Sequence, residues 1–116
     1  MAGLAAELNG RRFVTISNAQ GLSSAATIFR YEVDGHTITG HYAGGDVDAG
    51  RVVGRITGPS SIELLFQCVA NDQRLLAGRS SGTVGRTEDG RLTLEFEWSW
   101  LAGSEGGGRS SYVELI

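Results

Sequence analysis

Residues 94–100, LEFEWSW, place a large apolar side chain at every second position. A leucine, a phenylalanine and two tryptophans alternate with two glutamates and a serine. A period of two is typical of a β-strand with one buried face and one solvated face, whereas an amphipathic helix repeats every 3.6 residues. The chain must therefore bury one face of a sheet that carries several large aromatic side chains.

Similar segments recur along the chain. The candidate strands are residues 11–18, 26–34, 36–43, 50–57, 61–70, 74–86, 91–101 and 110–116. Turn-forming pairs separate most of them, namely Asp34-Gly35, Gly44-Gly45, Gly58-Pro59, Asn71-Asp72 and Asp89-Gly90. The 18 glycines and the single proline fit many short turns and bent strands. Only residues 2–8 could form a turn or two of helix.

About eight strands with short connections predict an antiparallel meander. Closing the meander into a barrel removes its exposed edge strands, which would otherwise pair with other chains. An eight-stranded barrel encloses side chains or one small ligand. With 116 residues, the chain is long enough for one core. The sequence therefore predicts an all-β protein whose residues 1–116 form a single antiparallel up-and-down barrel.

Hairpin geometry predicts which side chains point inward. A two-residue loop at Asp34-Gly35 pairs Phe29 with Gly40 and puts Phe29 and Tyr31 on the apolar, inner face. Two-residue loops at Asn71-Asp72 and Asp89-Gly90 both turn the odd-numbered residues of 75–83 inward. One extra residue in either loop would reverse this assignment, because side chains alternate between the two faces.

The same pairing places small or polar residues beside the tryptophans. Trp98 lies opposite Ser81, and Trp100 lies opposite Arg79. The large rings could interdigitate as ordinary core, or they could wall a cavity. A buried guanidinium needs a carboxylate, an aromatic ring or an anionic ligand, although Arg79 could also stack on Trp100 or reach out at the barrel mouth. The candidate ligand-binding residues are Trp98, Trp100, Arg79, Tyr42, Tyr31, Phe29 and Ser81.

The sequence predicts no metal, cofactor or nucleic-acid site. The basic residues are ten arginines without a clustered stripe, and the net charge is −3. His36 and His41 face opposite sides of one predicted strand, so they cannot share a metal. Residues 79–86 are rich in glycine, but no helix follows to make a phosphate loop. Asp46 and Asp48 are typical of solvated turns rather than of a calcium site.

The single cysteine and the N-terminal segment bear on localisation. Cys68 cannot close an intrachain disulfide, which favours a reducing compartment, and its apolar strand favours a small buried residue over a nucleophile. Residues 1–10 lack the basic and apolar regions of a signal peptide. No apolar run reaches the roughly 20 residues of a membrane helix. We therefore expect a cytoplasmic protein with no membrane partner.

Several motifs resemble a known family. The glycine-rich stretch formed by Tyr42, Gly44, Gly45, Gly50 and Gly54 and the Trp98/Trp100 pair are its most specific parts. They resemble a family of small bacterial proteins often labelled N-acetylglutamate synthase, and the resemblance covers most of the chain. The expected fold also resembles the calycin barrels, which are the lipocalins, fatty-acid-binding proteins and avidins. An acetyltransferase needs a pyrophosphate-binding loop at a helix start, which this sequence does not offer.

Three functions fit these features. The first is binding of a small, largely apolar molecule in a barrel pocket. The second is a cofactor-free cyclase or isomerase that uses the barrel as a template for a reactive substrate, with Arg79, Tyr42 and the tryptophans stabilising developing charge. The third is a structural homodimer without ligand, whose interface would include the outward-facing Leu65 and Val69.

Overall fold

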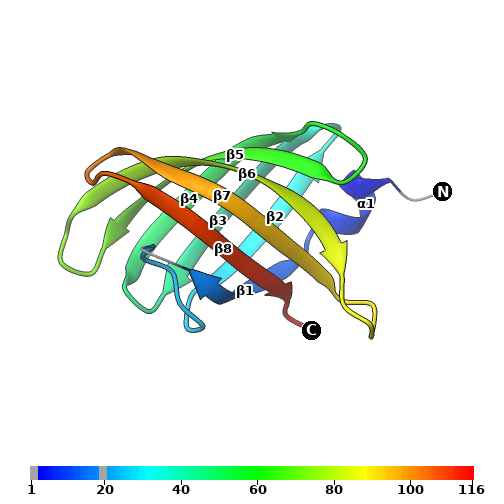
Figure 1. The fold of residues 1–116 in the computed structure, drawn as a ribbon, viewed down its shortest axis with the longest axis horizontal. Coiled ribbons are helices and arrows are strands. Elements are labelled where there is room, and N and C mark those ends of the chain that lie inside the picture. Colours follow the sequence, from blue (N-terminus) through cyan, green and yellow to red (C-terminus); the bar gives the residue numbers. More distant parts are fainter. Residues whose placement is uncertain (1–2, 19–20) are drawn as a thin grey trace.

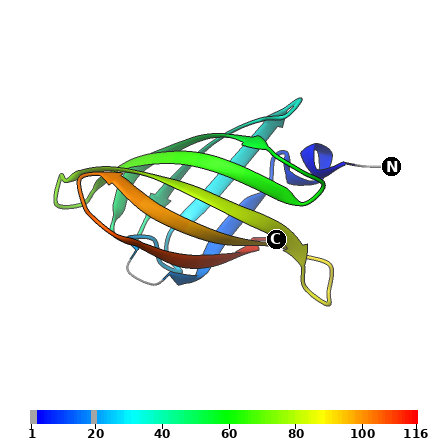
Figure 2. The same ribbon diagram turned by 45° about the horizontal axis from the view of Figure 1, so that its top comes forward.

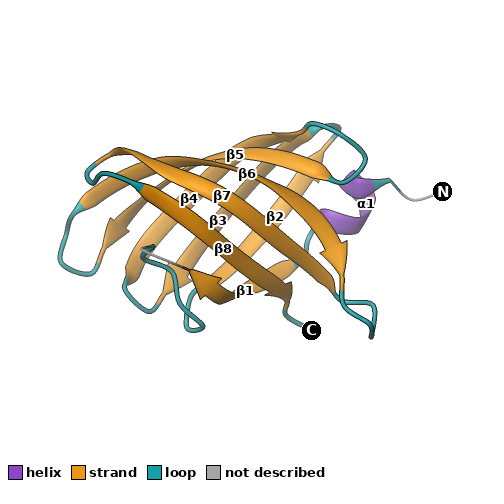
Figure 3. Cartoon of the chain, in the orientation of Figure 1, coloured by secondary structure: helices purple, strands orange, loops and turns teal. Residues whose placement is uncertain are grey.

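The computed structural model, which describes residues 3–18 and 21–116, forms a closed antiparallel barrel (Figures 1 and 3). The strands follow one another around the barrel in chain order, and the last pairs with the first. This confirms the all-β, up-and-down prediction. The elements are α1 (Leu4–Leu8), β1 (Arg12–Asn18), β2 (Ile28–Asp34), β3 (Thr37–Gly44), β4 (Val47–Ile56), β5 (Ser61–Ala70), β6 (Leu75–Arg86), β7 (Leu92–Ala102) and β8 (Gly107–Glu114).

The loops on both sides of β6 are one residue longer than predicted. Residues 71–73 and 88–90 each form a three-residue loop, and the last residue of each, Gln73 and Gly90, has a positive φ of 71° and 88°. This is the usual form of a three-residue hairpin loop. The extra residue moves β6 by one position against both neighbours, so its even-numbered residues face inward. The predicted inward orientation of the odd-numbered residues is wrong.

The β2–β3 hairpin illustrates a register error that leaves the faces unchanged. Its two-residue loop is Gly35-His36, one position later than predicted. The register therefore shifts by two, and Phe29 lies opposite Tyr42 instead of Gly40. Because side chains alternate with a period of two, Phe29 and Tyr31 still point inward.

Glycines on the inner face make room for large side chains on the neighbouring strand. A Cβ at Gly50 would come within 2.6 Å of the ring of Tyr42, and one at Gly78 within 2.7 Å of the ring of Phe66. Strand glycines commonly mark such close approaches. The cross-strand pairs of this kind are Gly40–Tyr31, Gly50–Tyr42, Gly54–Leu64, Gly78–Phe66 and Gly82–Phe96.

The helix α1 closes one end of the barrel, as Figure 2 shows. Its Leu8 is fully buried and joins the core, and Leu4 packs against the core beside it. An ion pair of 2.7 Å between Glu7 and Arg86 fixes the helix to β6. The β1–β2, β3–β4, β5–β6 and β7–β8 connections lie at the opposite end, where Leu22 of the β1–β2 connection packs against the core.

A buried carboxylate joins three parts of the chain at the closed end. Glu114, 6% exposed, accepts a hydrogen bond from the Arg11 guanidinium and another, of 3.0 Å, from the backbone N–H of Leu92. Burial by itself would raise the pKa of this carboxyl. The hydrogen bonds outweigh burial, and the pKa lies below the usual range for glutamate.

Replacing Glu114 by glutamine should lower the free energy of unfolding by about 2 kcal/mol at neutral pH, because two hydrogen bonds lose their charge. The carboxylate stabilises the fold above its unfolded pKa of about 4.3, and this contribution is lost as the pH falls through the lower folded pKa. Urea unfolding at neutral pH and in strong acid should therefore show the variant and the wild type converging in acid. An equal difference at both pH values would contradict this role of Glu114.

Candidate functional site

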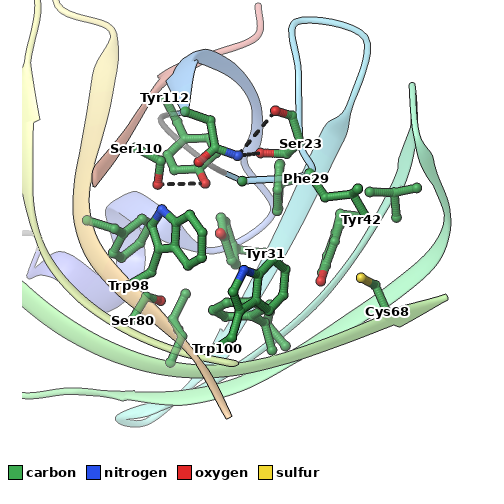
Figure 4. A pocket seen from close by; sticks show the side chains of 18 residues that line it. Ser23, Phe29, Tyr31, Tyr42, Cys68, Ser80, Trp98, Trp100, Ser110 and Tyr112 are labelled. Carbon is green, nitrogen blue, oxygen red and sulfur yellow. Dashed lines mark hydrogen bonds between the residues drawn. The ribbon is translucent and has the colours of Figure 1, made fainter. Parts of the chain in front are cut away.

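A cavity lies inside the barrel, and the ends of the strands away from α1 contribute most of its wall (Figure 4). Eighteen of the described residues line it, and none of these carries a charged side chain. They are Asn18, Gly21, Leu22, Ser23, Phe29, Tyr31, Tyr42, Val47, Val52, Leu64, Phe66, Cys68, Ser80, Phe96, Trp98, Trp100, Ser110 and Tyr112. The cavity is therefore apolar with a few neutral polar groups.

Aromatic rings from two separate sets of strands form much of the wall. On β2 and β3, Phe29 stacks on Tyr42 with ring centroids 4.6 Å apart and an interplanar angle of 17°. On β7, Trp98 meets Trp100 edge to face at 5.1 Å. Phe66 on β5 packs against Trp100 in the same way at 5.8 Å. These rings offer flat apolar surfaces to a ligand.

Neutral polar groups gather where β8 meets the β1–β2 connection. The hydroxyl of Tyr112 donates a hydrogen bond of 2.9 Å to Ser110 Oγ. Asn18 Nδ2 donates to both the carbonyl oxygen and Oγ of Ser23, at 3.2 and 2.8 Å. Because a carbonyl can only accept, these contacts fix the amide orientation and leave Asn18 Oδ1 with no partner among the described residues.

The titratable side chains of the cavity are neutral at physiological pH. Burial raises the pKa of Tyr31 and of Tyr42 far above the ordinary tyrosine value, and it raises that of Tyr112 as well. Burial also raises the pKa of the Cys68 thiol. A thiolate is the reactive form of cysteine, so this position favours packing over nucleophilic chemistry. The cavity thus contains neither a counter-ion nor a strong base at neutral pH.

The structure brings five of the seven predicted site residues together. Trp98, Trp100, Tyr42, Tyr31 and Phe29 all line the cavity. Their role in binding a ligand stays a prediction.

The predicted inward positions of Arg79 and Ser81 are wrong, because both side chains lie on the outer surface of β6. Arg79 is 57% exposed and forms an ion pair of 3.1 Å with Glu63 on β5. The physical reason is the extra residue in each flanking loop, which reverses the faces of β6. Ser80 takes the inward place instead and is 5% exposed.

Sequence reasoning also missed several polar residues of the cavity. Asn18 is the last residue of β1, and Ser23 follows that strand. Neither belongs to a run of alternating apolar residues, so periodicity could not find them. Ser110 and Tyr112 do alternate within the last predicted strand, and that signal could have placed them on the inner face.

The remaining candidates lie outside the cavity. His36, His41, Asp46 and Asp48 are exposed. Within residues 3–18 and 21–116, no three histidine, cysteine, aspartate or glutamate side chains gather as a metal centre would require. The described part of the chain also contains no helix long and apolar enough to cross a membrane.

The outward-facing apolar residues of β5 keep the orientation expected of them. Leu65 is 57% exposed on the outer surface, and Val69 on the same strand is half-buried. Whether they form a homodimer interface stays a prediction.

Comparison with known proteins identifies the family. The sequence model of the family described as Avidin-like protein matches residues 6–115. Comparisons with curated proteins and with solved structures give no significant match. The family match covers nearly the whole chain and agrees with the calycin-like barrel expected from the sequence. The chain belongs to the avidin-like family.

Proposed function

We propose that this protein binds a small, largely apolar and uncharged molecule in the barrel cavity. The observation that carries the proposal is a wall rich in aromatic rings whose described residues include no charged side chain. An ion entering this cavity would lose hydration without gaining a counter-charge, which is costly. Membership of a family named after avidin supports the same class of function. The anionic ligand considered with an inward Arg79 no longer has a partner.

The free space sets the size of the ligand. The cavity leaves about 60 Å³ free, whereas a water molecule needs roughly 10–15 Å³ and a benzene-binding cavity measures about 150 Å³. Anything larger than a few waters must therefore displace part of the wall. Of the two tryptophans in the wall, Trp100 is only partly buried. Its ring is therefore held less firmly by packing than that of Trp98, and it is the ring that a ligand would displace.

Binding is favoured over cyclase or isomerase catalysis. The raised pKa values of Tyr31, Tyr42 and Cys68 leave these groups without basic character at neutral pH. A proton-transfer catalyst needs a pKa near the working pH. Template catalysis would have to proceed through shape alone.

The test uses benzene, a small neutral ring that must displace part of the wall to enter, as the probe, together with two neighbouring serines on β6. Ser80 faces the cavity and Ser81 faces solvent, so Ser80→Leu should fill the site whereas Ser81→Leu should not. In NMR titrations we expect saturable benzene binding to the wild type and to Ser81→Leu, and at least tenfold weaker binding to Ser80→Leu. Near-ultraviolet circular dichroism checks that each variant is folded. Failure of the wild type to bind, or equal binding by both variants, would refute the proposal.

A further inference from the structure

Trp98 carries an unsatisfied hydrogen-bond donor in the cavity wall. The residue is 8% exposed, and its indole nitrogen Nε1 is buried without an acceptor among the described residues. Leaving a buried N–H without a partner costs about 1–3 kcal/mol. Such a cost needs an explanation, as does the unpaired Asn18 Oδ1 in the wall of the same cavity.

The neighbours of the indole do not satisfy the donor. On the inner face Trp98 pairs with Ser80 on one side and with Gly108, which has no side chain, on the other. Neither supplies an acceptor to Nε1. In Figure 4 the indole nitrogen faces the side of the cavity where Ser110 and Tyr112 are drawn. It is therefore directed toward the polar end of the space that a ligand would occupy.

We propose that Trp98 determines the specificity of this site by donating the Nε1–H to an acceptor atom of the ligand. The inference rests on the proposed binding function and narrows its ligand class. The ligand is an uncharged, mainly apolar molecule with a carbonyl oxygen or a ring nitrogen placed against the indole. An isosteric molecule without that atom leaves the donor unpaired and binds more weakly, as sites built around a hydrogen bond generally do.

The matched probes are benzene and pyridine in mildly alkaline buffer, where pyridine is uncharged. The two rings have the same shape and differ by one acceptor nitrogen. The chain has two tryptophans, so its ¹⁵N-labelled form gives two indole N–H signals, and Trp98→Phe assigns them. Pyridine should move the Trp98 signal downfield on binding, whereas benzene should not produce that hydrogen-bond shift.

The variants test the same point through affinity. Trp98→Phe should reduce the affinity ratio of pyridine to benzene about tenfold, within the range for losing one hydrogen bond. Trp100→Phe is the matched control, because it removes the same atoms from the same wall but leaves Trp98 in place. It should change the affinities for pyridine and for benzene by the same factor, because the Trp98 donor is retained, and so leave their ratio unchanged within about twofold.

The outcomes separate this inference from the proposed function. If benzene fails to bind the wild type, the proposed function fails and the inference falls with it. If benzene binds but pyridine gives no hydrogen-bond shift at Trp98, or if Trp98→Phe keeps the wild-type ratio, the inference is wrong and the binding function stands. The wild-type shift decides the question even if Trp98→Phe does not fold.

Discussion

Replacing Gly82 by alanine is expected to lower the free energy of unfolding by about 3 kcal/mol, although only one methyl group is added. Gly82 lies on the inner face of β6 opposite Phe96. A Cβ there would overlap the backbone carbonyl oxygen of Glu95 and Cδ1 of the Phe96 ring. The carbonyl belongs to the neighbouring strand and cannot move without disturbing the ladder, so the strain falls on the barrel itself.

The control is Gly85→Ala on the same strand. A Cβ at Gly85 would meet only Oγ1 of Thr93, at 3.1 Å. Both substitutions restrict the unfolded chain equally, which by itself stabilises the fold by about 0.4–1 kcal/mol. Urea unfolding should therefore show a large loss for Gly82→Ala and almost none for Gly85→Ala. Similar losses of unfolding free energy for the two variants would mean that the packing of the Phe96 ring does not require a glycine at position 82.

The hydrophobic period predicted the fold and the inner faces of several strands. Residues 94–100 alternate so regularly that their inward rings follow from the sequence alone. Phe29 and Tyr31 also faced inward as predicted, although their cross-strand partners were wrong. A register error of two residues preserves the face, whereas an error of one reverses it.

The orientation of β6 depended on the length of two loops, which composition does not determine. Gln73 adopts a positive φ of 71°, although glutamine gives little sign of that conformation. The Asp89-Gly90 pair is typical of a two-residue loop, yet Gly90 is the third residue of a longer one. One additional loop residue therefore places Ser80 at the cavity, where the sequence predicts Arg79.

The polar end of the cavity depends on tertiary structure. Asn18 and Ser23 approach Ser110 and Tyr112 only because β1 closes the barrel against β8. The unpaired donor of Trp98 likewise cannot be read from the sequence, because it depends on the described residues placing no acceptor beside Nε1 in the folded barrel. The aromatic wall could be predicted from periodicity, but the hydrogen-bonding groups that would select a ligand could not.

Leu8→Ala is expected to lower the free energy of unfolding by about 3 kcal/mol, because it leaves a void beneath α1 at the closed end of the core. Leu8 is fully buried, whereas Leu4 on the same helix is only partly buried. Leu4→Ala should therefore cost about 1 kcal/mol, in proportion to the apolar surface that it removes from the interface. Urea unfolding of both variants measures the difference.

The Leu8→Ala and Leu4→Ala variants also test whether α1 only closes the barrel or takes part in ligand binding. Neither leucine is among the described residues that line the cavity. Under conditions where Leu8→Ala remains folded, its affinity for benzene should therefore stay within about twofold of the wild-type value, because the substitution removes no atom from the cavity wall. A loss of affinity that follows the loss of stability would mean that the closed end and the cavity are coupled through the core. Unchanged affinity in a destabilised barrel would assign α1 to folding and the opposite end to ligand recognition.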